Sequence, residues 1–454
     1  MLDGQVIGIM PRSLRPFMMS PHECIAWNGD YPRHILRHHI CRCLPLPKED
    51  AKETMCDACN TSPEFLTREG ESRRGFLTAG AAAAVAAPLA AAGFAGTARA
   101  QDVNALAESQ VQSWAAFDTD GAFAPHTITR RAAGPKDVVV EIMYSSICHS
   151  DIHTYKGDWG PQVYPLVPGH EMVGRVVAIG ADVIKFREGD YAGVGTMVDS
   201  CGTCANCVAD REQNCLNGTT FTYGSEDKIS GGLTQGGYSK KIVVKEEFAL
   251  RIPPGVDLAG FAPLLCAGIT TFSPINHWDL KPGQRYGVIG MGGLGHLAVK
   301  LAVAKGAEVV VFTTSEDKIA DAKAFGAAEA YLWSDEEALA KQAMSFDLMI
   351  STVPVAYEMQ PFLNMLKLDK TLVNVGALFE VQGAQGMMMA FNRQSLAGSM
   401  TGGIAETQAV IDFAAAHGVA ASYEMITPDQ IGEACEKVVN KEARYRYVID
   451  MTAA

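Results

Sequence analysis

The sequence predicts an α/β protein with two domains, a β-rich domain followed by a doubly wound parallel sheet. Between residues 117 and 266 the chain is a series of short β-rich runs, such as VVVEIMY at 138–144, separated by Gly, Pro and Asp. This pattern is typical of an all-β or barrel-like domain with long loops. After Gly268 short apolar runs alternate with helical segments. That alternation favours parallel strands joined by helices.

The second domain is expected over residues 267–400, and the C-terminal segment 401–454 is expected to complete the first. The first strand of the second domain is GVIG at 287–290, and VVVFTT at 309–314 follows the next helix. Continuous apolar runs of this length are typical of strands buried on both faces of a parallel sheet. The tail ends in the strand-like run YRYVID, so the chain is expected to return to the first domain.

Composition indicates a globular protein and narrows its partners. The 454 residues are 48% hydrophobic and 20% charged, which is enough to bury at least one full core. The formal net charge of −13 argues against nucleic acid or an anionic membrane surface as a partner. Five of the 12 cysteines precede residue 60, and the other seven are an odd number that does not suit a pure disulfide framework. Metal-binding thiolates are therefore expected.

Residues 1–100 form a leader, expected to be disordered or cleaved, that contains a twin-arginine export signal. The run SRRGFL at 72–77 leads into an Ala-rich stretch that closes with Ala98-Arg99-Ala100, a small-residue cleavage site. A membrane-spanning helix is the alternative, but the stretch contains Pro88 and is barely long enough. The mature protein is therefore expected outside the cytoplasm, in the periplasm, without stable membrane association. If the leader is not functional, the protein stays cytoplasmic.

Two further features precede the signal. Cys56 and Cys59 lie near His38 and His39 and could form a second metal site, but the sequence has no second CxxC nearby, which favours a disordered leader. Met55 is an alternative translation start. No fold is predicted for this segment.

A glycine-rich turn between a strand and a helix predicts a dinucleotide site. Its residues are Gly290, Gly292, Gly293, Leu294 and Gly295. Glycines at this spacing permit a tight turn and let backbone N–H groups reach a pyrophosphate at the helix N-terminus. A purely structural glycine turn is the alternative.

The end of the following strand predicts NADP(H) in preference to NAD(H). An NAD site usually carries Asp or Glu there, whose carboxylate holds the ribose hydroxyls and repels a 2′-phosphate. This chain has Thr313, Thr314 and Ser315 instead, with Lys318 one turn further. Hydroxyls and an ammonium accept a phosphate more readily. A solvated surface lysine is the alternative for Lys318.

Cys201, Cys204, Cys207 and Cys215 predict a structural zinc site. Four thiolates within 15 residues can close a tetrahedral cage and leave no open coordination position. Iron–sulfur ligation is the rival, but the seven-residue gap and the missing Cys-Pro count against it. Two disulfides are the remaining alternative.

Three separate segments supply a Cys, His, Cys set, one of the ligand sets of catalytic zinc: ICHSDIH at 147–153, GHE at 169–171, and Cys266. Each is weak alone, since a buried cysteine or core histidine is common. Together with the cysteine cluster and the glycine motif, they make residues 117–454 resemble the zinc-containing medium-chain alcohol dehydrogenases. The resemblance is greatest to the cinnamyl alcohol dehydrogenase and broad-specificity aldehyde reductase branch.

The resemblance implies a fold and a role for each residue. The fold is a GroES-like catalytic domain plus a Rossmann domain. Cys148, His170 and Cys266 would hold a catalytic zinc, with Glu171 close enough to exchange with its water ligand. Asp151 would accept the other imidazole proton of His170. Ser150 would pass the alcohol proton through cofactor hydroxyls to His153 and solvent. A polar strand end is the alternative for His149, Asp151 and His153, and Trp159 is assigned either to the substrate pocket or to packing.

The expected protein is a homodimeric, two-zinc dehydrogenase that transfers hydride between NADP(H) and a primary alcohol or aldehyde. The zinc would act as a Lewis acid on the substrate oxygen. Two alternatives remain open. Export separates the enzyme from a pool that recycles NADP(H), which favours a dismutase-like nicotinoprotein with tightly held cofactor. A non-catalytic zinc-binding or thiol-buffering protein is the other.

Overall fold

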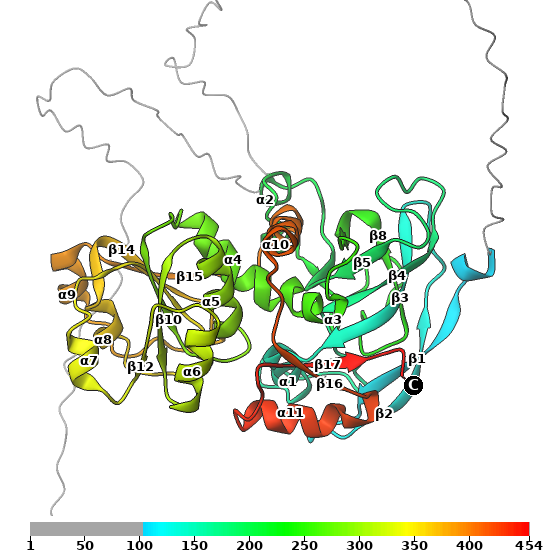
Figure 1. Ribbon diagram of the computed structural model, residues 1–454. Helices are drawn as coiled ribbons and strands as arrows, with labels where there is room; N and C mark the ends of the chain where they lie inside the picture. Colours follow the sequence, from blue (N-terminus) through cyan, green and yellow to red (C-terminus); the bar gives the residue numbers. More distant parts are fainter. Residues whose placement is uncertain (1–102, 454) are drawn as a thin grey trace, which may run out of the picture. The chain divides into compact units, whose positions relative to one another are not determined.

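The computed structural model describes residues 103–453, which belong to one compact unit (Figure 1). The predictions for residues 1–100, including the twin-arginine signal and the pair Cys56 and Cys59, lie outside the described residues. Two large β-sheets organise residues 103–453.

The first sheet has seven strands and organises the β-rich part of the chain. Its path runs β16-β17-β3-β4-β5-β9, and β8 also pairs with β3. The strands span Asp137–Ser146 (β3), Met172–Ile179 (β4), Tyr191–Val194 (β5), Lys241–Lys245 (β8), Ala249–Arg251 (β9), Tyr423–Ile426 (β16) and Arg446–Asp450 (β17). Because β17 pairs antiparallel with β3, the C-terminal strand belongs to this sheet. Val138 and Val140 of β3 belong to the buried core of this part of the chain.

Smaller elements surround this sheet. Two short antiparallel pairs join β1 (Ser109–Ala116) to β2 (Phe123–Arg130) and β6 (Met197–Asp199) to β7 (Thr220–Phe221). The helices of this part are α1 (His149–Tyr155), α2 (Ala205–Val208), α3 (Leu258–Phe261), α10 (Ile404–His417) and α11 (Ile431–Val439). Short 3₁₀ segments span Val103–Leu106 (η2), Glu212–Asn214 (η3), Glu246–Phe248 (η4), Ala262–Leu265 (η5) and Pro428–Gln430 (η6).

The second sheet is six-stranded and entirely parallel, in the order β12-β11-β10-β13-β14-β15. Its strands span Arg285–Ile289 (β10), Glu308–Thr313 (β11), Glu329–Leu332 (β12), Phe346–Ser351 (β13), Leu366–Asn374 (β14) and Ser395–Gly398 (β15). The connecting helices are α4 (Ala267–His277), α5 (Gly295–Ala304), α6 (Asp317–Ala324), α7 (Glu336–Ala340), α8 (Gln360–Leu363) and α9 (Gly386–Asn392).

Successive residues of these strands point to opposite faces, and helices cover both (Figure 1). Val309 and Val311 pack in a core that includes buried residues of α4, α5 and α6, whereas Val310 and Phe312 pack in a core that includes α7 and α8. Two covered faces explain why these strands read as continuous apolar runs. The predicted fold class, a β-rich domain plus a doubly wound parallel sheet, is confirmed.

Among residues 103–453, no single helix is both long and apolar enough to cross a membrane, whereas the bent pair Leu258–Leu265 and Ala267–His277 meets the length and composition criteria when taken together.

Candidate active site

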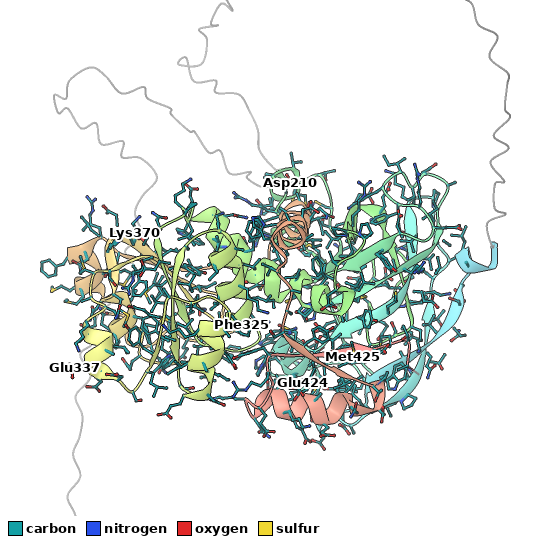
Figure 2. The ribbon with its side chains drawn as sticks, viewed as in Figure 1. Asp210, Phe325, Glu337, Lys370, Glu424 and Met425 are labelled. Carbon is teal, nitrogen blue, oxygen red and sulfur yellow. The ribbon has the colours of Figure 1, made fainter. Side chains whose placement is uncertain are left out.

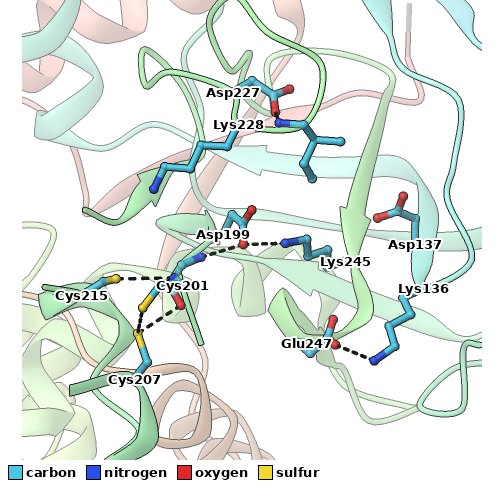
Figure 3. Close-up of polar contacts among 12 residues, drawn as sticks. Lys136, Asp137, Asp199, Cys201, Cys207, Cys215, Asp227, Lys228, Lys245 and Glu247 are labelled. Carbon is cyan, nitrogen blue, oxygen red and sulfur yellow. Dashed lines mark hydrogen bonds and ion pairs between the residues drawn. The ribbon is translucent and has the colours of Figure 1, made fainter. Parts of the chain in front are cut away.

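The four cysteines of the 201–215 segment converge on one point, and Figure 3 shows three of them, Cys201, Cys207 and Cys215. Their sulfur atoms all lie within 4.8 Å of one another. Cys207 Sγ lies 3.9 Å from Cys201 Sγ and 3.5 Å from Cys204 Sγ. Four sulfurs in a tetrahedron around an ion at Zn–S distances of about 2.3 Å are separated by about 3.8 Å. The donor set and its spacing therefore fit a structural zinc ion.

The surrounding backbone is arranged to receive thiolates. Backbone N–H groups of Cys204 and Leu216 point at Cys201 Sγ and Cys204 Sγ, at 3.3 and 3.4 Å. Donors from the backbone of Thr203 and Cys204 lower the pKa of Cys201 to about 5. The described cysteines, these four included, are free thiols rather than disulfides. The loop is anchored beside the sulfurs by Asp199, which accepts a hydrogen bond from Lys245 at 2.7 Å (Figure 3).

A second cluster joins three distant segments of the chain. Ligand atoms of Cys148, His170, Glu171 and Cys266 lie within 4.8 Å of one another. Cys148 is the N-cap of α1, the His-Glu pair directly precedes β4, and Cys266 separates η5 from α4. All four are buried, with Cys266 the most exposed at 9%. Two thiols, one imidazole and one carboxylate form a set that fits a catalytic zinc.

Electrostatics in this cluster favour a thiolate beside an imidazole. A hydrogen bond from Cys266 lowers the pKa of Cys148 well below its ordinary value, against the opposing effect of burial. The same contact, together with burial, raises the pKa of Cys266. Burial lowers the pKa of His170, but the Asp151 carboxylate and Cys148 outweigh it and raise that pKa well above its ordinary value.

Asp151 fixes the orientation of His170. One carboxylate oxygen accepts hydrogen bonds from His170 Nδ1 at 2.9 Å and the Gly169 N–H at 3.1 Å. The other accepts from the Cys148 N–H at 2.9 Å and the Tyr238 hydroxyl at 3.0 Å. A carboxylate only accepts, so Nδ1 carries a proton, and Nε2 is the nitrogen that would bind a metal ion in the cluster.

Glu171 is held by groups that the sequence analysis did not identify. Its carboxylate contacts the Ser146 hydroxyl and the Arg446 guanidinium, and its other oxygen accepts the Ala267 N–H at 3.3 Å. Burial raises the pKa of Glu171 to about 7, and Arg446 opposes that shift. Arg446 is itself 3% exposed. The pair therefore links strand β17 to the edge of the cluster.

The proposed relay residues lie on α1 near the cluster. Ser150 Oγ is 3.7 Å from Cys148 Sγ. His153 Nδ1 lies 2.8 Å from the Asp158 carboxylate, and its ring stacks on Trp159 at a centroid distance of 5.2 Å. Among residues 103–453, His153 Nε2 has no hydrogen-bond partner. Trp159 is 46% exposed, so it contacts the predicted relay rather than the protein core.

The glycine motif forms the turn between β10 and α5. Gly290 has a φ of +92°, and a Cβ at Gly295 would lie 2.0 Å from the Gly290 carbonyl oxygen, so both positions require glycine. A Cβ at Gly292 would meet nothing within 4 Å, so that side of the turn faces open space. Leu294 is the N-cap of α5. A Cβ at Gly293 would lie 3.1 Å from the Arg446 side chain. The turn fits a pyrophosphate with a guanidinium beside it.

The predicted 2′-phosphate residues follow β11. Thr313 is buried at the end of the strand and its hydroxyl accepts the Ser315 N–H at 3.3 Å, while Thr314 is exposed. The Ser315 hydroxyl donates to Asp317 in the first turn of α6, and Lys318 follows. Burial and, to a smaller extent, Lys441 lower the pKa of Lys318. Ser315 and Lys318 therefore stand on either side of the first residue of α6.

Sequence reasoning missed several residues that the structure places at these sites: Ser146, Asp158, Tyr238, His296, Arg444 and Arg446. Arg446 stands in the YRYVID run that was predicted as a strand, and a charged residue inside such a buried run is the signal that could have identified it.

Known families match both halves of this architecture. Residues 134–254 match the alcohol dehydrogenase GroES-like domain, and residues 293–416 match the zinc-binding dehydrogenase family.

Curated relatives and solved structures agree with these matches. The chain is 48% identical over 343 residues to NADP-dependent alcohol dehydrogenase C 1 of Mycolicibacterium smegmatis, which covers 75% of this chain and 98% of that protein. It is 46% identical over 343 residues to the aldehyde reductase YahK of Escherichia coli, with the same coverage. A cinnamyl alcohol dehydrogenase of Helicobacter pylori, complexed with NADP(H), superposes with a TM-score of 0.72 at 38% identity, over 76% of this chain and 99% of that one. The chain therefore belongs to the zinc-containing medium-chain alcohol dehydrogenase family, in the branch of the cinnamyl alcohol dehydrogenases and aldehyde reductases.

Proposed function

We propose that the protein is an NADP-dependent zinc alcohol dehydrogenase that reduces aldehydes and oxidises the corresponding primary alcohols. The observation that carries this proposal is the convergence of Cys148, His170 and Cys266, from three separate segments, on one buried point. When bound there, zinc supplies a Lewis acid that polarises the substrate oxygen, and the nicotinamide exchanges the hydride. A closed four-thiolate site, by contrast, serves structure alone.

The chain's own residues supply positioning and proton transfer. Asp151 holds His170 in the tautomer that can bind metal. Ser150 stands beside Cys148, where it can take the substrate hydroxyl proton, and His153 can deliver that proton to solvent while Asp158 holds its ring. Asp158 thereby keeps the buried Nε2 as the atom that accepts the proton, and the contact between Nδ1 and the exposed Asp158 leads toward solvent.

The preference for NADP(H) rests on Thr313, Thr314, Ser315 and Lys318. A carboxylate at the end of the second strand is the usual device that repels a 2′-phosphate, and this strand ends in hydroxyls. The relatives named as NADP-dependent support the same assignment.

The decisive experiment compares NADPH and NADH as hydride donors on the full chain, with matched aromatic and aliphatic aldehydes. We expect NADPH to be oxidised only when aldehyde is present, and this oxidation to stop after a chelator removes zinc. NADH is expected to be oxidised more slowly than NADPH. A clear preference for NADH contradicts the assignment of Thr313 to Lys318. Protein with two zinc ions per chain but no change in nicotinamide absorbance with any aldehyde favours the non-catalytic alternative.

We also propose a homodimer formed through the edge of the parallel sheet. Strand β15 is an outer strand, and apolar side chains gather near it: Phe379 (77% exposed), Met387 (74%), Phe391 (74%) and Met400 (62%). An exposed apolar patch beside an unpaired edge strand is a surface that proteins cover. Light scattering is expected to give the dimer mass, and Met387→Lys combined with Phe391→Asp is expected to give the monomer.

Export through the twin-arginine motif at residues 72–77 is likewise our proposal, supported by that motif and the Ala98-Arg99-Ala100 site. Cell fractionation is expected to place the mature chain, beginning at Gln101, in the periplasm. Replacement of Arg73 and Arg74 by Lys should then retain it in the cytoplasm. Nucleotide released on denaturation of the periplasmic protein, with turnover in the absence of added NADP(H), would identify the nicotinoprotein alternative.

A further inference from the structure

Two carboxylates lie beside the position proposed for the 2′-phosphate. Asp317 and Asp321 are one turn apart on α6, the helix that also carries Lys318. The Ser315 hydroxyl donates to Asp317, so this carboxylate touches a group assigned to the phosphate. Asp321 lies close enough to Lys318 to raise the pKa of the lysine, although burial has the larger effect and lowers that pKa.

Uncompensated carboxylates at this position would oppose the phosphorylated cofactor. A 2′-phosphate carries nearly two negative charges, and a carboxylate at the end of the second strand is the device by which NAD sites exclude it. Asp317 stands only a few residues beyond that position. The local sequence therefore contains a feature that favours NAD(H), against the hydroxyls that favour NADP(H).

Arg444 compensates both carboxylates. Its guanidinium contacts Asp317 and lies 2.8 Å from Asp321, and the Tyr445 hydroxyl donates to Asp321 at 2.6 Å. These residues line one surface hollow with Ser422 and with Phe325 at the end of α6, labelled in Figure 2.

The position of Arg444 is fixed by the two residues that follow it. Tyr445 stacks on His296 of α5 at a centroid distance of 5.1 Å and an interplanar angle of 15°. Arg446 is buried against Glu171. These two contacts fix the backbone beside Arg444, so the guanidinium starts close to α6.

We infer that Arg444 is a specificity-determining residue, which permits NADP(H) by neutralising Asp317 and Asp321 beside Ser315 and Lys318. The inference rests on the proposed NADP dependence. It assigns to Arg444 an indirect role: the guanidinium acts on the carboxylates, and the phosphate is bound by the hydroxyls and the ammonium.

The test measures binding of 2′,5′-ADP and 5′-AMP to the zinc-loaded full chain by titration calorimetry, so it does not depend on turnover. Arg444→Gln is expected to weaken the binding of 2′,5′-ADP by about tenfold, because it leaves one more uncompensated negative charge at short range near the surface. The affinity for 5′-AMP is expected to change by less than about twofold. Arg393→Gln, which breaks a similar exposed pair with Asp369 on β14, is the matched control and should leave both affinities unchanged.

The double variant Arg444→Gln/Asp317→Asn separates neutralisation from direct contact. It restores the net charge of the cluster, so 2′,5′-ADP affinity is expected to return close to that of the unmodified chain. A double variant as weak as Arg444→Gln overturns the inference, because Arg444 would then bind the phosphate itself. An Arg444→Gln chain that keeps the full preference for 2′,5′-ADP overturns it too. If the unmodified chain does not prefer 2′,5′-ADP over 5′-AMP, the proposed NADP dependence fails first.

Discussion

The Arg446 guanidinium forms a buried ion pair with the Glu171 carboxylate, which joins the last strand of the chain to the catalytic cluster. Removing one partner of a buried pair leaves the other charge uncompensated, at a cost of about 3–5 kcal/mol. Arg446→Met is therefore expected to lower the free energy of unfolding by up to that amount, measured by urea denaturation of the zinc-loaded protein at pH 8.5, above the pKa of about 7 that burial gives Glu171.

The double variant Arg446→Met/Glu171→Gln tests the origin of this loss. With both charges removed, the free energy of unfolding should recover by more than half of the loss. A double variant less stable than Arg446→Met would show that Glu171 is not the group left uncompensated.

The cysteine cluster should be separable from the catalytic cluster. Cys207→Ser removes a central sulfur of the 201–215 site, so zinc content is expected to fall from two ions per chain to one and the melting temperature to fall with it. Elemental analysis and calorimetry measure the two effects. Cys435→Ala, which removes a buried cysteine outside both clusters, is the control and should retain both ions. Loss of both ions in Cys207→Ser would show that the sites are not independent.

The sequence predicted best those parts of the molecule whose residues are neighbours along the chain. The four cysteines fall within 15 residues, so their spacing alone predicts a closed cage. The glycine turn is likewise local, because Gly290 has a positive φ of +92° and a Cβ at Gly295 would meet the Gly290 carbonyl oxygen. The alternation of strands and helices predicted the doubly wound sheet for the same reason.

What the sequence could not predict depends on which strands become neighbours. Arg446 reaches Glu171 across 275 positions only because β17 pairs with β3. Tyr238 reaches Asp151 across 87 positions. Long-range contacts of this kind follow from the sheet order, which hydrophobic periodicity does not specify.

Asp151 offers a test of how firmly His170 must be held for the cluster to work. In Asp151→Asn an NH₂ group replaces one acceptor oxygen. This donor would face the N–H donors that the carboxylate now accepts, so His170 loses its fixed tautomer. Zinc affinity and kcat are expected to fall by about 10–100-fold, measured by chelator competition and by steady-state kinetics. Tyr238→Phe removes one of the same hydrogen bonds without changing charge and should cost less. Equal losses in the two variants would argue against a role for the Asp151 charge.

The proton relay can be tested at Asp158, the carboxylate that contacts His153. Asp158→Asn keeps the shape beside His153 but removes the charge that orients its ring. We expect kcat for alcohol oxidation at neutral pH to fall about tenfold with little change in KM, because positioned proton transfer contributes about 10²–10⁴-fold and the ring itself is retained. Added imidazole should restore part of the loss. An unchanged kcat would place the proton path elsewhere.

His296 predicts an acid-sensitive contact between the glycine turn and the C-terminal segment. Burial lowers the pKa of this histidine to about 3, and its Nε2 accepts the Ser422 N–H at 3.1 Å, which requires the neutral ring. The folded pKa lies below the unfolded value of about 6.5, so the stability from His296 is fully present above pH 6.5 and is lost as the pH falls toward 3. The loss should be on the order of 1.4 kcal/mol per pH unit within that window. Urea denaturation at pH 7.0 and 5.5 should therefore show a steeper decline for the unmodified chain than for His296→Gln, which cannot take up the proton. Parallel declines would mean that other groups control the acid sensitivity.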